Sequence, residues 1–538
     1  NPKKIRDEIK KNISKFKLFE ISSRETAIHK AIQNLNSGEI LLVAGKGHES
    51  YQEYSKRKFF SDRKQILKSI KIKNKNLFNN YKSNIILEEL GNTRKSFFKK
   101  INNACIDSNK IKKNDIFFGL KGKKLDGNKF AIEANKKGAA FSIVDKKYHL
   151  SNKIFKVKNS ISFLTNVSKK IKNLSNITSI AVTGSAGKTS LKEILAFCFT
   201  KYYSTICSKK SFNNHIGVPL SLFNIKNEKF GIFEVGMDKK GEIDFLTKII
   251  KPNLGIITNV SYAHAKNFKN LSDIAFAKSE IIDNIKSGGT IVLNKDDKFF
   301  NFFEKKALKR NLKIVSFGTS KKCEISFKKV IKNKNSFKLI IHIYNKKKIF
   351  FIKKNFLSYL PNILAATAVL SNYINAEKLN KNLFYNLKLL SGRGNLTKLN
   401  FNDKVINLID ESYNSNPLSL KFSINNFDSL FSKNNKKYVL LGDMLELGKF
   451  SRKLHFDAAK EINKSTINKV YVYGNNIRNT FNKIKTQKKG KIFDRKSKIL
   501  DFIRYEMPNN SCLMIKGSNA TGLKDIVSKI KLKEKNAL

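Results

Sequence analysis

The segment from Thr183 to Ser190 limits the possible folds of this chain more than any other part of its sequence. It follows an apolar run predicted to be a buried strand, residues 177–182, and precedes a predicted helix, residues 191–197. A strand, a glycine-rich turn and a helix N-terminus together present several backbone N–H groups and a helix dipole to one anion. The pattern therefore predicts a nucleoside triphosphate site within a mostly parallel α/β sheet.

Two side chains of this loop have roles of their own. Lys188 adds a mobile positive charge for the outer phosphates, and Thr189 offers a hydroxyl to Mg²⁺. The match to the general phosphate-loop pattern is incomplete, because Val182 stands where that pattern has its first glycine. A short Gly-Lys-Thr match also occurs in chance turns, so the rest of the chain must decide. The nucleotide-binding residues expected from the loop are Thr183, Gly184, Ser185, Ala186, Gly187, Lys188, Thr189 and Ser190.

Length and charge bound the class of protein. A chain of 538 residues is too long for one ordinary domain, and about 3–4 domains are expected. Lys and Arg number 107 against 42 Asp and Glu, a formal net charge of +65 that ordinarily favours nucleic-acid binding. The basic residues are spread along the whole chain, however, and form no single stripe. We therefore expect no dedicated nucleic-acid partner, although such a field attracts anionic substrates.

The cysteines and the apolar runs bear on the compartment. The 5 cysteines are scattered without a Cys-x-x-Cys pair, which argues against a disulfide framework or a zinc site and favours a reducing cytoplasm. No apolar run approaches the ~20 residues that a bilayer span needs. The chain begins with Asn1 instead of Met, so we expect residues upstream of it and leave open whether they include a targeting segment.

Strand and helix patterns divide the chain into units. The first contains a predicted strand, residues 39–44, between helical patterns at 24–35 and 62–70, and the polar stretch 71–84 is predicted to be a linker. Residues 305–355 are expected to add antiparallel strands to the phosphate-loop domain. The remaining expected strands are 115–120, 140–144, 230–235, 254–260, 290–293, 406–410, 438–441, 470–473 and 512–515. The expected units are 1–75, a linker 76–84, 85–175, 176–385 with the phosphate loop, and 386–538.

Polar side chains follow several of these strands. Glu234 follows the apolar run 230–233 of a predicted strand, on the edge that carries the phosphate loop, where it can hold Mg²⁺; otherwise it is a solvated loop residue. His264 falls on the same edge and could ligate a second metal, although a lone histidine is more often structural. Lys278, in a helical stretch, is by charge alone an ordinary surface lysine, and Asn294 either caps a helix or contacts a base.

A dense polar run, Asp410 to Pro417, follows a strand of the last domain. Asn416 before Pro417 is a helix-start pattern, because proline suits the first helical position. Part of this run is therefore structural, but it holds more polar groups at a strand end than capping requires.

Taken together, these motifs resemble the Mur ligases, which build the peptide of bacterial cell-wall precursors. Within the family they resemble the branch that adds D-alanyl-D-alanine to UDP-N-acetylmuramoyl-tripeptide. The segments that carry the resemblance are 183–193, 212–219, 234–236, 259–278, 392–394, 410–417, 441–448 and 516–518, and upstream 106–108, 117–122 and 126–127. It runs from about residue 85 to the C-terminus. It implies an α/β fold of three domains: a UDP-binding domain, a central ATPase with a mostly parallel sheet, and a Rossmann-like C-terminal domain.

The first unit resembles a different branch, the ligases that add meso-diaminopimelate. Residues 44–49, followed by Phe60, Ser61 and Asp62, are similar to the C-terminal domain of that branch, in which Gly45 and Glu49 match positions that contact the amino-acid substrate. The resemblance implies an extra partial Rossmann-like domain, the remnant of a fusion of two consecutive pathway enzymes. The alternatives are a loose Gly-Lys-Gly turn or a unit that only docks partners.

The resemblance also implies a reaction and its residues. The cofactors are ATP and Mg²⁺, and the reaction passes through an acyl phosphate in the cytoplasm. Lys188, Glu234, His264 and Lys278 would be catalytic; Thr189 and Glu234 would hold one Mg²⁺, and His264 and Lys278 a second. The family carries this lysine as a carbamate, which turns a cation into a carboxylate-like ligand. Asn294, Arg393 and Asp410 would contact ATP. The implied substrate-binding residues are Asp107, Ser108, Asp126, Asn213, Asn214, His215, Tyr413, Asn414 and Asn416.

Some questions stay open at this stage. Asn109 and Asn519 stand where the family usually has arginine, which puts substrate affinity in doubt, though not the reaction class. Because the nucleotide contacts come from two domains, closure must precede chemistry. Association with other Mur enzymes is a further expectation. The competing interpretations are a folylpolyglutamate synthase, which shares the ATPase fold, and a basic nucleic-acid-binding NTPase.

Overall fold

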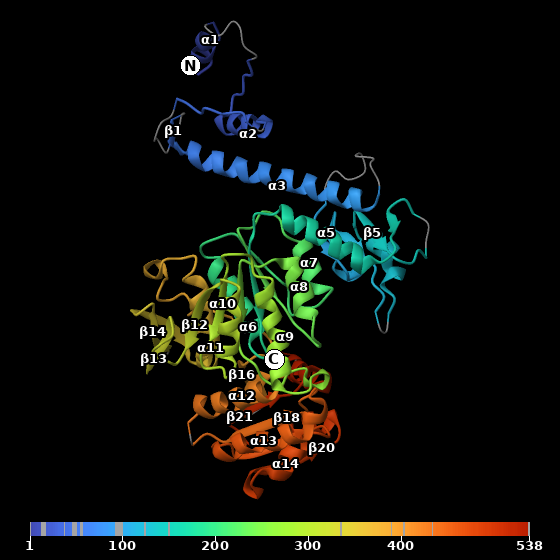
Figure 1. Ribbon diagram of the computed structural model, residues 1–538, viewed down its shortest axis with the longest axis vertical. Coiled ribbons are helices and arrows are strands. Elements are labelled where there is room, and N and C mark those ends of the chain that lie inside the picture. Colours follow the sequence, from blue (N-terminus) through green and yellow to red (C-terminus); the bar gives the residue numbers. More distant parts are fainter. Residues whose placement is uncertain are drawn as a thin grey trace.

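A computed structural model describes most of the chain. The described residues are 2–11, 18–36, 38–45, 51–53, 57–91, 101–122, 125–148, 151–333, 336–388, 390–401, 404–432 and 434–535. In Figure 1 the parts follow one another along the long axis, from the N-terminal helices (blue) through a small α/β domain and a large central domain to the C-terminal domain (orange to red). Of the described residues, none belongs to a helix both long enough and apolar enough to span a membrane.

The N-terminal unit differs from its prediction. It contains α1 (Pro2–Lys11), α2 (Arg24–Asn34), a short antiparallel pair β1 (Tyr51–Glu53) and β2 (Arg57–Phe59), and the long α3 (Asp62–Glu89). The predicted strand at 39–44 is wrong, since these residues form no strand and Ile40 and Leu42 are 96% and 85% exposed. An apolar run becomes a strand only beside a hydrogen-bonding neighbour, and the described part of this unit pairs none with it. The extra Rossmann-like domain therefore stays a prediction.

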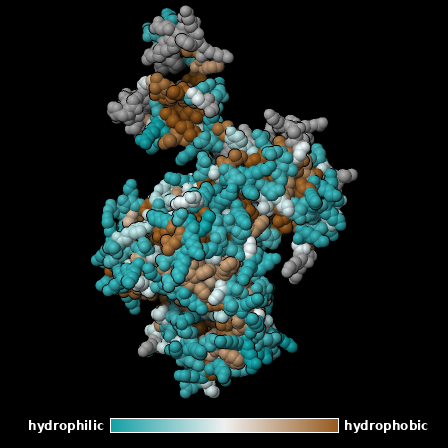
Figure 2. All heavy atoms as spheres, viewed as in Figure 1, coloured by the Kyte–Doolittle hydropathy of each residue, from teal (hydrophilic) through white to brown (hydrophobic). Residues whose placement is uncertain are grey.

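The predicted linker at 71–84 is also wrong, because these residues lie inside α3. Lysine and leucine are good helix formers, and no glycine or proline interrupts the sequence between Asp62 and Glu89. The end of α3 is anchored in the next domain, where Ile85 and Ile86 join its core. Figure 2 shows hydrophilic side chains spread over most of the visible face, with hydrophobic ones gathered over α2 and α3.

The small α/β domain is built on a parallel sheet. Its order is β3-β4-β5-β6, with bounds β3 (Ala104–Cys105), β4 (Ile116–Phe118), β5 (Phe141–Val144) and β6 (Ile154–Lys156). The helices are α4 (Ala131–Lys136) and α5 (Ser160–Leu174). Helix α5 packs against α3 and against α7 (Gly217–Phe223) of the central domain. The predicted strands at 115–120 and 140–144 are confirmed as β4 and β5.

A nine-stranded sheet forms the central domain, in the order β15-β14-β13-β12-β11-β10-β7-β9-β8. Its strands are parallel from β8 to β13, and β13, β14 and β15 are antiparallel, as predicted for part of 305–355. The strands are β7 (Thr178–Thr183), β8 (Thr205–Cys207), β9 (Phe230–Glu234), β10 (Leu254–Ile257), β11 (Thr290–Asn294), β12 (Lys313–Gly318), β13 (Ile325–Lys332), β14 (Ser336–Ile343) and β15 (Lys346–Lys353). The helices are α6 (Lys188–Phe199), α7 (Gly217–Phe223), α8 (Glu242–Ile250), α9 (Leu271–Asp283), α10 (Phe300–Lys309) and α11 (Leu360–Leu370).

The C-terminal domain has a six-stranded sheet in the order β16-β17-β21-β18-β19-β20, with only the β16–β17 pair antiparallel. The strands are β16 (Asn395–Phe401), β17 (Lys404–Glu411), β18 (Lys437–Gly442), β19 (Lys469–Tyr473), β20 (Lys489–Phe493) and β21 (Ser511–Lys516). The helices are α12 (Pro417–Leu430), α13 (Ser451–Lys464), α14 (Arg478–Lys483), α15 (Lys496–Asp501) and α16 (Leu523–Lys535). Because parallel strands end at one edge, the loops after β17, β18 and β21 come together, and this edge faces the phosphate loop.

Candidate active site

The phosphate loop connects β7 to α6 and depends on two glycines. Gly184 and Gly187 have φ angles of 144° and 84°. A Cβ atom on Gly184 would lie 1.9 Å from Thr258 Oγ1, and one on Gly187 would lie 2.8 Å from Asn362 Oδ1. Asn259 stabilises the turn, since its Oδ1 accepts a hydrogen bond of 2.9 Å from the Ala186 N–H. The loop is therefore packed on β10 and α11 with its N–H groups at the start of α6.

Lys188 begins α6 and turns back over the loop. Its Nζ donates a hydrogen bond of 2.7 Å to the carbonyl oxygen of Gly184. Burial lowers the pKa of Lys188, whereas the nearby carboxylate of Glu234 raises it. A half-buried ammonium that faces a cavity interacts strongly with an anion, as a phosphate-binding lysine requires.

Glu234 ends β9 and lies beside this loop, 1% exposed. Its Oε1 accepts a hydrogen bond of 2.8 Å from Asn213 Nδ2. Its Oε2 is buried and has no hydrogen-bond partner among the described residues. Glu234 lines the same cavity as Thr189, and an orphaned carboxylate oxygen with a threonine hydroxyl supplies oxygen donors of the kind that Mg²⁺ prefers. Glu234 and Thr189 therefore fit a magnesium ion.

A second group of metal-ligand type surrounds His264. Its Nδ1 lies 2.8 Å from Asp238 Oδ1 and 2.6 Å from Glu446 Oε2, without the geometry of a hydrogen bond to either. One ligand atom from each of the three residues lies within 4.8 Å of the others. Burial and the charge of Lys188 lower the pKa of His264, so the neutral ligand form is favoured. These residues could hold a divalent cation at the boundary between two domains.

Lys278 is buried in α9, only 3% exposed, so the composition-based expectation of a surface lysine is wrong. Burial lowers the pKa of its amine well below the ordinary value, and the charge of Lys188 adds to the effect, while Asp297 opposes it. This shift increases the fraction of the amine in its neutral, nucleophilic form at a given pH.

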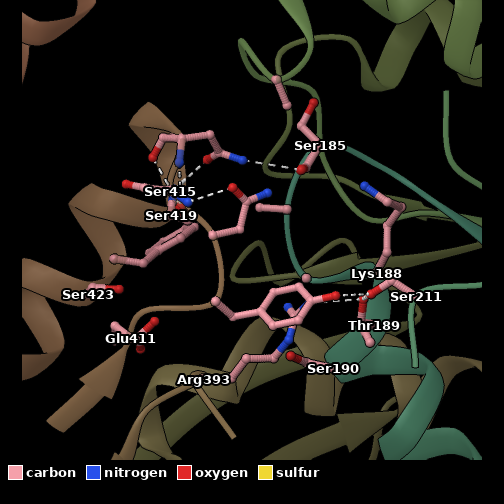
Figure 3. Close-up of a pocket in the computed structure, with 18 of the residues that line it drawn as sticks. Ser185, Lys188, Thr189, Ser190, Ser211, Arg393, Glu411, Ser415, Ser419 and Ser423 are labelled. Carbon is pink, nitrogen blue, oxygen red and sulfur yellow. Dashed lines mark hydrogen bonds between the residues drawn. The ribbon is translucent and has the colours of Figure 1, made fainter. Parts of the chain in front are cut away.

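The C-terminal domain lies directly on the phosphate loop (Figure 3). Arg393 Nη2 donates a hydrogen bond of 3.1 Å to Thr189 Oγ1, and the guanidinium lies 4.2 Å from the ring centroid of Tyr413. The Tyr413 hydroxyl is 2.7 Å from Ser211 Oγ. Asn416 caps α12 and also donates from Nδ2 to the carbonyl oxygen of Ser185, at 3.3 Å. Groups more than 200 residues apart in sequence thus meet at the boundary between the central and C-terminal domains.

A cavity of about 530 Å³ occupies this boundary. It brings together many of the residues predicted from the sequence. Those that line it are Ser185, Ala186, Gly187, Lys188, Thr189, Ser190, Asn213, Glu234, His264, Arg393, Tyr413, Asn414 and Asn416. Its volume is in the range of small-molecule and cofactor sites.

Other predicted residues do not line this cavity. Asn294 joins the end of β11 to the residues that follow β10, since its Nδ2 donates to the Thr258 carbonyl oxygen at 3.1 Å. Asp410 is 1% exposed and supports the Arg393 turn: its Oδ2 accepts from the Gly392 N–H at 3.2 Å, and its Oδ1 from the Ser412 hydroxyl at 2.6 Å. In this conformation both carboxylate oxygens are already engaged.

The residues predicted to bind the UDP part of a substrate lie in the small α/β domain. Asp107 and Asp126 each cap a 3-10 turn, accepting from the N–H groups of Asn109 and Asn128. Ser108 is buried, with its hydroxyl 3.4 Å from the carboxylate of Glu133. These turns follow β3 and β4 at the carboxyl edge of that sheet, the usual place for a ligand.

Four of the predicted substrate-binding residues remain. Asn214 is exposed, and its Oδ1 accepts at 2.9 Å from the N–H of Gly217, the first residue of α7; His215 is exposed beside it. Gly45 adopts φ 94°, with open space where a Cβ would stand. Glu49 lies outside the described residues.

Sequence reasoning missed several cavity residues. Ser211 contacts both Thr189 and Tyr413. Asn362 of α11 donates to the Gly187 carbonyl oxygen at 3.3 Å. The hydroxyl of Tyr359, the residue before α11, donates to the Arg393 carbonyl oxygen. The only signal for Asn362 was its place after a proline at a helix start. Glu446 and Lys516 stood in resembling segments without an assigned role.

The fold and the site define a class of enzyme: a phosphate-loop domain whose nucleotide cavity is completed by a second, Rossmann-like domain. Family models match along the same domains: the Mur ligase family catalytic domain at residues 100–189, the Mur ligase middle domain at 182–370 and the Mur ligase glutamate ligase domain at 393–519. The chain belongs to the Mur ligase family.

Curated relatives and solved structures agree. A UDP-N-acetylmuramoyl-tripeptide--D-alanyl-D-alanine ligase of Buchnera aphidicola subsp. Baizongia pistaciae is 30% identical over 437 residues, covering 80% of this chain and 92% of the relative. The ligase of the same name from Rickettsia prowazekii is 29% identical, covering 79% and 94%. MurF of Thermotoga maritima in complex with ADP has a TM-score of 0.69 at 25% identity, covering 81% and 99%. MurF of Acinetobacter baumannii has a TM-score of 0.71 at 21% identity, covering 83% and 98%, and shows the shared fold.

Proposed function

We propose that this chain is an ATP-dependent ligase that joins D-alanyl-D-alanine to UDP-N-acetylmuramoyl-tripeptide in cell-wall precursor synthesis. The observation that carries the proposal is the cavity in which Arg393 of the C-terminal domain reaches Thr189 of the phosphate loop. A site shared by two domains suits a reaction that brings a nucleotide and two further substrates together. The names of the relatives supply the identity of the two peptide substrates.

The proposed reaction has two steps. First the tripeptide carboxylate attacks the γ-phosphorus of ATP, and ADP leaves, so that an acyl phosphate forms. The amine of D-alanyl-D-alanine then attacks the acyl carbon, and the tetrahedral intermediate collapses to the amide as phosphate leaves and the amine loses its proton. Phosphoryl transfer of this kind depends mostly on positioning and on charge neutralisation.

Each group of site residues has a proposed role in these two steps. The loop N–H groups and Lys188 would hold the β- and γ-phosphates, and Arg393 would neutralise charge on the transferred group. Asn294 and Asp410 are proposed ATP contacts. Bound Mg²⁺ would supply charge neutralisation on the phosphate oxygens, held by Thr189 and Glu234 and, at a second position, by His264 with Lys278. Tyr413, Asn414 and Asn416 would orient the incoming dipeptide beside the loop.

Lys278 enters as a carbamate in this proposal. Burial lowers the pKa of its amine, and a neutral amine adds CO₂ with loss of one proton and so becomes an anionic oxygen ligand. A carbamate carbon resonance in protein supplied with ¹³C-bicarbonate, absent from Lys278→Met, would support this. No such resonance would remove Lys278 from the ligand set.

Two wider proposals rest on sequence resemblance. Residues 1–75 would be the remnant of a diaminopimelate-adding ligase, so that the parent protein is a fusion of consecutive enzymes. The protein would act in the cytoplasm and could associate with other Mur enzymes. Binding of meso-diaminopimelate to the purified chain, lost in Gly45→Val, would support the remnant, whereas no binding would leave this unit without a substrate.

The test is phosphate release from ATP by the purified protein with both peptide substrates, each omitted in turn. We expect release only when ATP, UDP-N-acetylmuramoyl-tripeptide and D-alanyl-D-alanine are all present, and none from Lys188→Ala. Lys305→Ala, a change at an exposed lysine of α10, is the matched control and should keep full activity. Hydrolysis indifferent to both peptides, or release that instead requires a folate and glutamate, would refute the assignment.

A further inference from the structure

A buried lysine near the phosphate loop has no part in the reaction described above. Lys192 lies one helical turn after Lys188 in α6, and its side chain is 0% exposed. Its Nζ donates to the carbonyl oxygens of Ser208 at 2.5 Å and Lys210 at 2.7 Å, and lies 2.7 Å from Glu193 Oε1. Burying an ammonium is unfavourable unless its protons are taken up by such partners. The interaction therefore fixes Lys192 and the carbonyls it binds as one unit.

Those carbonyls belong to the segment from Ser208 to Asn213, here called the 208–213 loop. The loop leaves β8, and its first residue is tied to β9, since Ser208 N–H donates to the Ile232 carbonyl oxygen at 3.1 Å and Ser208 Oγ accepts from the Glu234 N–H at 3.1 Å. Lys210 adopts a φ angle of 47°, a left-handed conformation that residues other than glycine disfavour. The ammonium of Lys192 therefore holds the loop in a shape that its own backbone does not favour.

The far end of the 208–213 loop enters the active site. Ser211 Oγ lies 3.4 Å from Thr189 Oγ1 and 2.7 Å from the Tyr413 hydroxyl. Asn213 Nδ2 donates to Glu234 Oε1 at 2.8 Å and so leaves Oε2 free for a ligand. The loop thus contacts both residues that fit Mg²⁺ and a residue of the C-terminal domain. A displacement of residues 208–210 would therefore move the side chains that contact Thr189, Glu234 and Tyr413.

We propose that Lys192 is a positioning residue of the ligase: by clamping the 208–213 loop it sets Ser211 and Asn213, and through them the Thr189 hydroxyl and the Glu234 carboxylate. The proposal rests on the proposed function for its kinetic consequences, but binding of Mg²⁺ with ADP tests the geometry without any peptide substrate. A lysine that served only the stability of the fold would leave this binding unchanged.

The chain offers a matched control in Lys437, at the start of β18. It is 1% exposed, and its Nζ donates to the Asp428 carbonyl oxygen at 2.6 Å, to Asp428 Oδ1 at 3.0 Å and to Thr466 Oγ1 at 2.8 Å. The two lysines have the same kind of burial and partners. Lys437 lies at the end of its strand away from the loops that face the cavity, so Lys437→Met reports the cost of removing a buried ammonium alone.

The experiment compares Lys192→Met with Lys437→Met in the full chain. Both should lower the temperature of thermal unfolding. Only Lys192→Met should weaken Mg²⁺-dependent ADP binding, by about tenfold. It should also raise the Mg²⁺ concentration for half-maximal phosphate release, because the freed 208–213 loop displaces the metal-binding residues. Equal ADP binding by the two variants would overturn the proposal.

A second variant covers failure of Lys192→Met to fold. Lys192→Gln keeps two N–H donors without the charge, and it should show the same effect on ADP binding in weaker form. In an Asn213→Ala background, Lys192→Gln should reduce the affinity for ADP by a smaller factor than it does in the wild type, since the effects of residues that act through one another are not additive. Full additivity would contradict the proposal. A wild-type protein that binds ADP but makes no product from the peptide substrates would refute only the proposed function.

Discussion

Glu446 of the C-terminal domain lies 2.6 Å from Nδ1 of His264 in the central domain, and both residues have left-handed backbones, with φ angles of 63° and 54°. The Lys266 N–H donates to the Glu446 carbonyl oxygen at 3.0 Å, so the backbones are also joined. Each left-handed residue other than glycine costs about 1–2 kcal/mol. From two such residues that face each other across a domain boundary we predict that the contact serves function and not stability.

We therefore expect Glu446→Ala and Glu446→Gly to lose ligase activity alike, by about tenfold, because both remove the carboxylate that meets His264. Their stabilities should differ. Glycine relieves the left-handed strain, so Glu446→Gly should be more stable than Glu446→Ala by about 1 kcal/mol. Steady-state kinetics and thermal unfolding measure the two effects separately.

Glu506 provides the control, since its carboxylate is 50% exposed in an ion pair with Lys491 in the same domain. Glu506→Ala should keep full activity. If Glu446→Gly kept wild-type activity while Glu446→Ala lost it, the backbone and not the carboxylate would be responsible, and the interpretation of this contact would be wrong.

A second prediction concerns the orphaned oxygen of Glu234. Glu234→Gln should reduce phosphate release by about a hundredfold or more, because the buried anionic oxygen that fits Mg²⁺ is replaced by an amide. The ligand-free protein should be no less stable, since a buried charge has been removed. Mg²⁺ with ADP at about 100 times its Kd should stabilise the wild type by about 2.7 kcal/mol, and this gain should vanish in Glu234→Gln.

Glu280 is the matched control for this substitution. It is 8% exposed, and its two oxygens accept from the N–H groups of Gly241 at 2.8 Å and Asp244 at 3.0 Å. Glu280→Gln should lower the unfolding temperature, because a satisfied acceptor is lost, but leave stabilisation by Mg²⁺ and ADP intact. If instead Glu234→Gln unfolded at a lower temperature and kept its stabilisation by Mg²⁺ and ADP, while Glu280→Gln lost that stabilisation, Glu234 would be a structural residue.

The sequence was informative where local chemistry decides the structure. A strand, two glycines and a helix start define the phosphate loop, and Glu234 was found because β7 and β9 are parallel neighbours that end at one edge. Lys278 could not be located in the same way, since burial of a lysine depends on what packs around α9 and leaves no local pattern. The Lys- and Asn-rich stretch 71–84 was mistaken for a linker because its composition suggests a loop, although its helix propensity is high.

Contacts between domains were beyond the sequence for a different reason. Thr189 with Arg393, and Ser211 with Tyr413, lie more than 200 residues apart, and no spacing rule connects them. Asp410 shows the limit of resemblance: it was expected to contact ATP, yet in this conformation its carboxylate accepts a hydrogen bond from the Gly392 N–H. Which role it has depends on domain geometry that local sequence does not specify.

A third prediction separates shape from charge at Arg393. Arg393→Lys keeps the positive charge but loses both the planar stacking on Tyr413 and the fixed hydrogen-bond fork. We expect the KM for ATP to rise by about tenfold, with a smaller effect on the unfolding temperature. Arg452→Lys is the control, because Arg452 is exposed and its guanidinium lies 5.6 Å from the Phe456 ring centroid. An unchanged KM in Arg393→Lys would mean that charge alone suffices at this position.

The last prediction concerns pH and the buried end of α3. Lys82 is 1% exposed; its Nζ donates to the Ile225 carbonyl oxygen at 3.2 Å and lies 4.7 Å from the Phe223 ring centroid. Burial, with a smaller contribution from Lys226, lowers the pKa of Lys82 to about 7 from the ordinary value of 10.5, while Glu228 opposes the shift. Between these two pH values the unfolded chain binds the extra proton, so stability should rise with pH by about 1.4 kcal/mol per unit.

Below pH 7 both states carry the proton, and the full cost of burying the charge remains. Lys82→Met should therefore unfold at a higher temperature than the wild type at pH 6–7, and the difference should shrink as the pH is raised toward 9. Lys64→Met is the matched control, because Lys64 is exposed and lies at the same 4.7 Å from a ring centroid, that of Phe59. Its difference from the wild type should not change with pH. If Lys82→Met were less stable than the wild type at every pH, the contacts with Ile225 and Phe223 would outweigh the cost of burial, and the buried ammonium would be a net stabilising anchor for α3.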